Sequence, residues 1–203
     1  MFKAVSNYFN KKNLKNDKYL YLFDQYDGDE FICFDCETTG LNPKVDDIIS
    51  IGALKIKNNK ILTSQKFERF IKPKSCKLQA DSIKVHHIRE CDLNDAKEID
   101  EVIDEFLDFI GNRPLVGYYL EFDVAMVNKY IKSKLGIKLP NKQIEVSALY
   151  YDYKIEFIPQ GNIDLRFDTI LKELKVPRLG KHDAINDAIM TAMMFIKLQN
   201  QKK

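Results

Sequence analysis

The chain has 203 residues, of which 45% are hydrophobic and 31% are charged. This length and apolar content suit one water-soluble domain with a sizeable core and room for a short appendage. The formal net charge of only +2 excludes a broadly basic protein that coats nucleic acid, so any polynucleotide must be held by a local site.

Residues 1–29 are mixed in charge and only weakly periodic. We expect them to form a helical N-terminal appendage, packed on a domain that spans residues 30–203. The first residues contain no apolar run of the kind that a signal peptide needs. No window of the chain approaches the ~18 apolar residues of a membrane span. The sequence therefore predicts a cytoplasmic protein with no membrane partner.

Residues 31–36 are predicted to form a short buried strand that ends by delivering two acids. Asp35 and Glu37 are two residues apart, so both carboxylates leave the same face of the strand. Acids at the mouth of a buried apolar strand are costly, and carboxylate oxygens are the ligands that hard divalent cations prefer. The pair predicts a metal site. If further acids and a base join it, the protein is a metal-dependent enzyme that cleaves phosphodiesters.

The rest of the chain alternates between strand and helix patterns. Asn58-Asn59 joins two apolar runs and favours a hairpin. Apolar residues at three- and four-residue spacing predict a helix at 97–110, whose acidic outer face would repel phosphate. This order predicts an α/β fold with a mixed five-stranded sheet and helices on both faces. The other expected elements are strands at 48–56, 60–71, 114–119 and 143–149 and helices at 121–135, 164–174 and 183–198.

Asp123 lies one turn into the segment that follows the fourth predicted strand. Ligands of open α/β sheets collect where strands end and helices begin, so Asp123 is expected beside Asp35 and Glu37. An acid at this point can also serve only to compensate the helix dipole, and by itself Asp123 fits both interpretations equally well.

His182 and Asp187 flank the start of the last predicted helix. They are five residues apart, about 140° around a regular helix, so they reach one site only if His182 stands before the helix. The preceding Leu179-Gly180-Lys181 favours such a loop. A loop histidine suits a proton shuttle better than a metal ligand. Without the acids, the simpler interpretation of His182 is a capping or surface histidine.

Three motifs follow one another along the chain: Phe34-Asp-Cys-Glu-Thr-Thr-Gly-Leu41, Phe122-Asp123 and His182-x-Ala-x-x-Asp187-Ala. Over about residues 30–199 they resemble the motifs of the DEDDh 3'→5' exonuclease superfamily, most of all the proofreading (epsilon) subunit of bacterial DNA polymerase III. The resemblance implies a ribonuclease H-like fold and two bound Mg²⁺ or Mn²⁺ ions. It further implies that His182 deprotonates the attacking water and that four acids hold the ions: Asp35, Glu37, Asp123 and Asp187.

The same resemblance implies contacts with the substrate. Thr38 would contact the 3' end through its backbone, Leu41 would wedge against the terminal bases, and His86 would contact the terminal nucleotide. A surface histidine is an almost equally good interpretation of His86. Phe122 could form a base-stacking platform, although a core aromatic is the more typical role. Where many relatives carry His-Asn before the Phe-Asp motif, this chain has Tyr118-Tyr119.

The leading hypothesis is a metal-dependent 3'→5' exonuclease that removes 5'-mononucleotides from single-stranded or frayed DNA 3' ends. Its product would be a nucleoside monophosphate, and a DNA polymerase is a candidate partner. One alternative keeps the mechanism but trims RNA, since the choice of sugar depends on room for the 2'-hydroxyl. A second alternative is a non-catalytic nucleic-acid-binding module that has kept the fold.

Overall fold

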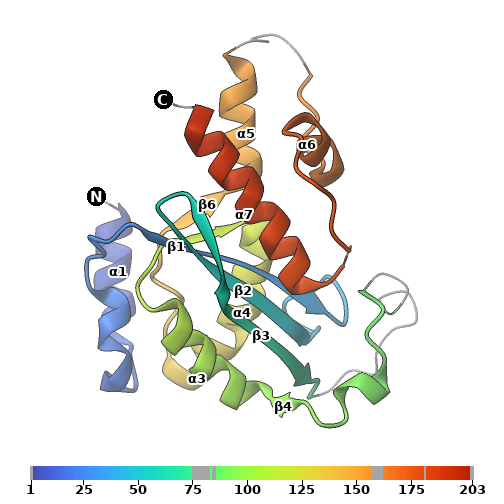
Figure 1. Cartoon of the computed structure of the whole chain (residues 1–203). Helices are drawn as coiled ribbons and strands as arrows, with labels where there is room; N and C mark the ends of the chain where they lie inside the picture. Colours follow the sequence, from blue (N-terminus) through green and yellow to red (C-terminus); the bar gives the residue numbers. More distant parts are fainter. Residues whose placement is uncertain (1, 75–82, 84–85, 157–161, 181, 202–203) are drawn as a thin grey trace.

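The structure is a computed structural model that describes residues 2–74, 83, 86–156, 162–180 and 182–201 (Figure 1). The strands are β1 (Glu30–Thr38), β2 (Ile48–Lys57), β3 (Lys60–Lys72), β4 (Lys97–Glu98), β5 (Leu115–Gly117) and β6 (Gln143–Glu145). The α-helices are α1 (Phe2–Lys12), α3 (Ile99–Ile110), α4 (Leu120–Leu135), α5 (Val146–Ile155), α6 (Phe167–Glu173) and α7 (Ala184–Gln201). Short 3₁₀ helices lie at Asp17–Phe23 (η1) and Glu90–Leu93 (η2).

The strands form one mixed sheet in the order β4-β3-β2-β1-β5-β6. β1, β2 and β3 are antiparallel neighbours, as the hairpin signal predicts, and β5 and β6 continue the sheet in parallel on the other side of β1. The predicted mixed sheet with helices on both faces is confirmed. The predicted number of five strands is wrong, because the described residues form six.

The extra strand is β4, which pairs in parallel with Ile71 and Lys72 at the end of β3. The apolar spacing predicts a helix from residue 97, whereas α3 begins at Ile99. A strand of two residues is too short to give a periodic signal, so the pattern of the following helix hides it.

The prediction of a strand at 143–149 is wrong for its second half, which belongs to α5, and Glu145 explains why. β6 ends at Glu145, whose side chain accepts a hydrogen bond from the backbone N–H of Ser147 and so caps α5. The same carboxylate accepts hydrogen bonds from the backbone N–H groups of Tyr119 and Leu120. One side chain therefore fixes the starts of α4 and α5 at the same edge of the sheet.

Two hydrophobic clusters fill the two faces of the sheet. α3 and α4 pack on one face, and α5, α6 and α7 pack on the other. β1 is buried on both sides, since Cys33 and Phe34 belong to opposite clusters, as alternation along a strand requires. Among the helices that the structure describes, none combines the length and apolar content needed to span a bilayer.

Gly52 lets α7 approach the sheet beside Asp35, its pairing partner on β1. A Cβ atom at Gly52 would overlap the backbone of Ala184 and Ile185, at the start of α7. Gly52→Ala is therefore expected to lower the free energy of unfolding by about 1–3 kcal/mol and to displace the helix start, because backbone cannot yield as a side chain can. Urea unfolding measures the change.

The matched control is Gly180→Ala, where the added Cβ would meet only the end of the Asn186 side chain. This variant is expected to stay within about 0.5 kcal/mol of the parent. The packing argument fails if Gly52→Ala and the parent unfold at the same urea concentration.

Candidate metal centre

Three carboxylates meet at the end of β1. Asp35 and Glu37 come from the strand, and Asp187 comes from the first turn of α7. Each offers one oxygen, and these oxygens all lie within 4.8 Å of one another. Residues separated by about 150 positions are brought together because α7 lies directly on β1 and β2. The structure thus places three of the four predicted acids in one cluster.

The fourth acid, Asp123, lies in the first turn of α4 and is buried. It is outside the group of three, and its Oδ1 accepts a hydrogen bond of 3.0 Å from the backbone N–H of Cys36, between Asp35 and Glu37. Its charge nevertheless acts on both neighbours, because it raises the pKa of Asp35 and of Glu37. Asp123 therefore joins α4 to the strand that carries the other acids.

Burial and mutual repulsion disfavour the ionised form of these carboxylates when no cation is bound. Burial, and then the neighbouring carboxylates, raise the pKa of Asp35 well above its ordinary value and the pKa of Glu37 to about 8. Burial is also the main cause that raises the pKa of Asp123, and it raises the pKa of Asp187 to about 6. Crowded carboxylate oxygens of this kind fit a hard divalent cation, which would relieve both costs.

His182 stands just before α7, as its separation of five residues from Asp187 requires. The helix begins at Ala184, after Asp183 has capped it by accepting hydrogen bonds from the backbone N–H groups of Ile185 and Asn186. His182 has a left-handed backbone, with φ of 55°, and its own N–H donates to the Asp187 carboxylate. Lys181, the last residue of the predicted loop, lies outside the described residues.

One cleft of about 750 Å³ joins His182 to the acids, since its walls include His182, Asp35 and Asp187. The opposite wall comes from α6 and from Tyr118, whose ring packs edge-on against Phe167 with centroids 5.0 Å apart. No sequence motif assigns a role to Phe167. An aromatic residue in an amphipathic helix has the same pattern whether it lines a cleft or fills a core, so no local signal marks it.

Thr38 and Leu41 follow Asp35 and Glu37 directly along the chain. Thr38 ends β1, and its hydroxyl donates to the backbone oxygen of Gly40 at 2.7 Å. Leu41 is 85% exposed on the loop between β1 and β2, a position from which its side chain is free to contact a ligand. Phe122 is partly buried and packs against the core cluster.

His86 is only 5% exposed, so the surface interpretation is wrong for this residue. Its Nδ1 accepts a hydrogen bond of 3.0 Å from the backbone N–H of Ile88, and its Nε2 has no hydrogen-bond partner among the described residues. A small cavity of about 50 Å³ lies between His86, His182 and Asp183. The structure therefore places His86 behind His182 rather than on the outer surface.

The metal-free protein is expected to lose stability as the pH rises from about 5 to about 8. An unfolded glutamate ionises near pH 4.3, whereas folded Glu37 keeps its proton until the pH approaches its raised pKa of about 8. Between these values the folded state binds more protons than the unfolded state, so the free energy of unfolding falls as the pH rises.

Urea unfolding of the parent and of Glu37→Gln in EDTA, at pH 5.5, 7 and 8.5, measures this effect. The parent is expected to lose at least about 1 kcal/mol more than the variant over this range, or roughly 2–4 °C in Tm. Burial lowers the pKa of His86, which gives a slope of opposite sign, but both proteins share it. Equal pH slopes in the two proteins contradict the prediction.

Comparisons with known proteins find an exonuclease family, DNA polymerases and nucleases. A family model described as Exonuclease, RNase_T, matches residues 32–195. The PolC-type DNA polymerase III of Caldanaerobacter subterraneus subsp. tengcongensis is 36% identical over 173 residues, which is 83% of this chain and 11% of that protein. The PolC-type DNA polymerase III of Staphylococcus haemolyticus is 34% identical over 174 residues, 85% of this chain and 12% of that protein. The chain thus spans about a tenth of the length of these curated relatives.

Solved structures show the same fold at low identity. Cell-death related nuclease 4 has a TM-score of 0.73 and 16% identity, over 86% of this chain and 64% of that one. The nuclease domain of 3'hExo, a DEDDh family member bound to rAMP, has a TM-score of 0.71 and 15% identity, over 88% of this chain and 95% of that one. The expected ribonuclease H-like architecture is therefore confirmed.

Proposed function

Since the chain belongs to the RNase_T exonuclease family, we propose that it removes 5'-mononucleotides from single-stranded or frayed DNA ends in the 3'→5' direction. The observation that carries the proposal is the meeting of Asp35, Glu37 and Asp187, with oxygens within 4.8 Å, beside a cleft that Asp35, Asp187 and His182 line. Such a site has the acids and the base that hydrolysis of a phosphodiester needs.

Asp35, Glu37, Asp123 and Asp187 would hold two Mg²⁺ or Mn²⁺ ions, which lower the pKa of bound water and stabilise a leaving oxygen. His182 lines the same cleft from a loop, where it would take a proton from the attacking water. The bond between phosphorus and the 3'-oxygen of the preceding nucleotide breaks, and that oxygen regains a proton from solvent. The released product is a nucleoside 5'-monophosphate.

The substrate is proposed to meet the chain just beyond the acids. Leu41 would touch the terminal base from its exposed position, and Thr38 would contact the 3' end through its backbone. His86 would contact the terminal nucleotide, and the part of the Phe122 ring that is not packed against the core would form a base-stacking platform. DNA is favoured over RNA because the chain is similar to DNA polymerases III. The same likeness supports a DNA polymerase as partner, although the chain matches only about a tenth of those proteins.

We also propose that residues 1–29 form an appendage on an exonuclease domain at 30–203. The family model begins at residue 32, after α1 and η1. The appendage is held by apolar and polar contacts. Tyr19 and Leu22 belong to the buried core cluster, the Asn10 side chain both donates to and accepts from the backbone of Lys138, and Lys18 pairs with Asp108 at 3.2 Å. These contacts lie on residues of the proposed domain, so the appendage packs on it rather than extending from it.

A time course on 5'-labelled DNA and RNA oligonucleotides tests the proposal, with Mg²⁺, Mn²⁺ or EDTA in parallel. We expect a ladder of DNA products that shortens from the 3' end one nucleotide at a time, and no digestion in EDTA. Digestion of RNA that is faster than digestion of DNA would identify RNA as the preferred substrate. Loss of the 5' label in the first product, or full activity in EDTA, would overturn the proposal.

A further inference from the structure

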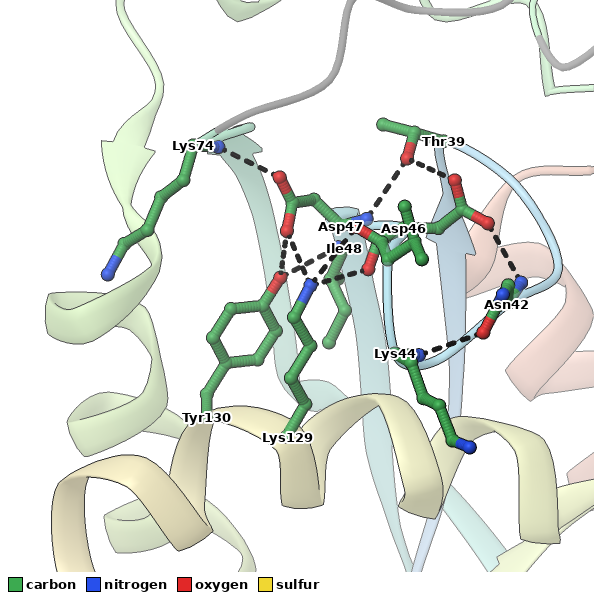
Figure 2. Close-up of polar contacts among 10 residues, drawn as sticks. Thr39, Asn42, Lys44, Asp46, Asp47, Ile48, Lys74, Lys129 and Tyr130 are labelled. Carbon is green, nitrogen blue, oxygen red and sulfur yellow. Dashed lines mark hydrogen bonds and ion pairs between the residues drawn. The ribbon is translucent and has the colours of Figure 1, made fainter.

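The loop between β1 and β2, residues 39–47, is closed at its base by Thr39 and Asp47 (Figure 2). The backbone N–H of Thr39 donates to the backbone oxygen of Asp47 at 2.9 Å, and the N–H of Asp47 donates to the Thr39 hydroxyl at 3.0 Å. Leu41 lies inside this loop, four residues after Glu37. The position of the loop therefore decides where Leu41 stands relative to the acids.

Within the loop, Asp46 holds the turn that follows Leu41. Its Oδ2 accepts from the backbone N–H of Asn42 at 2.8 Å, and its Oδ1 accepts from the Thr39 hydroxyl at 3.3 Å. Asn42 in turn accepts from the backbone N–H of Lys44 at 3.1 Å. These bonds give the loop a defined shape, but all of them are internal and none fixes the loop to the rest of the fold.

α4 supplies the external attachment, through Lys129 and Tyr130 (Figure 2). The Lys129 ammonium donates to the backbone oxygens of Val45 and Asp46, at 3.4 and 2.9 Å, and to the Asp47 carboxylate at 2.9 Å. The Tyr130 hydroxyl donates to the same carboxylate oxygen at 2.8 Å. Asp47 is 2% exposed, so these charge-assisted bonds are formed away from solvent and are worth more than surface pairs.

Asp47 also reaches a third segment, since its second oxygen accepts from the backbone N–H of Lys74 at 3.1 Å, just beyond β3. The helix that clamps the loop is itself joined to β1, because Asp123 bonds the backbone of Cys36. Asp123 and Lys129 are six residues apart on α4, about 9 Å along the helix. Hydrogen bonds therefore connect the loop, α4 and the segment of β1 that carries the acids.

We propose that Lys129, with Asp47 and Tyr130, is a positioning residue that holds Leu41 at a fixed place beside the acids and so sets the affinity for the terminal nucleotide. The proposal rests on the proposed function. Leu41 is expected to touch the terminal base and not the reacting atoms, so its displacement would remove binding that the ground state and the transition state share. Lys129 contacts the loop and none of the four acids proposed to hold metal. Its effect is therefore expected on the binding of the polynucleotide end rather than on the chemical step.

Lys129→Met tests this, because methionine keeps an apolar stem and removes the donors. The matched control is Lys134→Met, five residues further along α4. Lys134 pairs with Asp104 at 2.6 Å and donates to the backbone oxygen of Asp100, and its side chain is 29% exposed against 27% for Lys129. On a 5'-labelled DNA strand, Lys129→Met is expected to raise KM about tenfold and to change kcat less than about threefold. Lys134→Met is expected to leave KM within about twofold of the parent.

Equal KM values for the two variants, or a fall in kcat at constant KM for Lys129→Met, would overturn the inference. Should Lys129→Met fail to fold, Tyr130→Phe removes one donor and is expected to raise KM by a smaller factor, with no change again counting against the clamp. Backbone hydrogen exchange in residues 39–47 gives a readout that needs no nuclease activity. Exchange is expected to be faster in Lys129→Met than in Lys134→Met, and equal exchange contradicts the clamp even if the parent digests no nucleic acid.

Discussion

Asp35→Asn is expected to reduce exonuclease activity at least about a thousandfold while making the metal-free protein more stable. The activity falls because an amide supplies a weaker ligand for a divalent cation and carries no charge to balance it. The stability rises because the substitution removes an acid whose pKa is raised by burial and by Asp123, Glu37 and Asp187. An opposite response of activity and stability is the signature of a site built for function.

The measurements are digestion of a labelled DNA strand and thermal unfolding with and without Mn²⁺. The parent is expected to unfold at a higher temperature when Mn²⁺ is added, because the ion binds only the folded state, and Asp35→Asn is expected to lose most of this shift. The control is Asp168→Asn, which removes a carboxylate from the same cleft that is paired at 2.8 Å with the exposed Arg178. It is expected to keep activity within a few fold, since surface pairs contribute little. Digestion by Asp35→Asn at the rate of the parent would show that the acid cluster is not the active site.

The parts of the fold that follow from local periodicity could be predicted from the sequence. The buried strand at 31–36, the hairpin at Asn58-Asn59 and the amphipathic α3 each carry a pattern within a dozen residues. β4 and α5 could not be predicted, because one is too short for a period and the other depends on the Glu145 side chain as a cap. Both belong to interactions between segments rather than to a repeated pattern.

The approach of Asp35, Glu37 and Asp187 could be anticipated because each stands at the end of a strand or the start of a helix, where α/β sheets gather their ligands. The burial of His86 could not, since nothing in its neighbourhood distinguishes a surface turn from a segment folded back behind His182. No sequence pattern predicts the contact of Lys129 with Asp47 either, because a lysine on a helix usually points to solvent. Long-range polar contacts leave no periodic trace.

His182→Asn is expected to lower kcat by a factor of about 10²–10⁴ while leaving the metal response intact. Asparagine tolerates the left-handed backbone that His182 adopts, so the variant should keep the hydrogen bond from the backbone N–H of residue 182 to Asp187. The imidazole itself is lost, and with it the group proposed to take the proton from the attacking water. The shift in unfolding temperature caused by Mn²⁺ should therefore equal that of the parent, in contrast with Asp35→Asn.

The control for this substitution is His87→Asn, because His87 also has a left-handed backbone, with φ of 60°, and is exposed without lining the cleft. It is expected to digest DNA at the rate of the parent. Activity of His182→Asn should rise with pH as hydroxide replaces the missing base, so rates between pH 7 and 9.5 add a second measurement. A kcat within about threefold of the parent would show that His182 is not the catalytic base. A metal response lost together with activity would instead assign His182 a structural role, because a residue that acts only as a proton acceptor can be removed without disturbing the acids beside it.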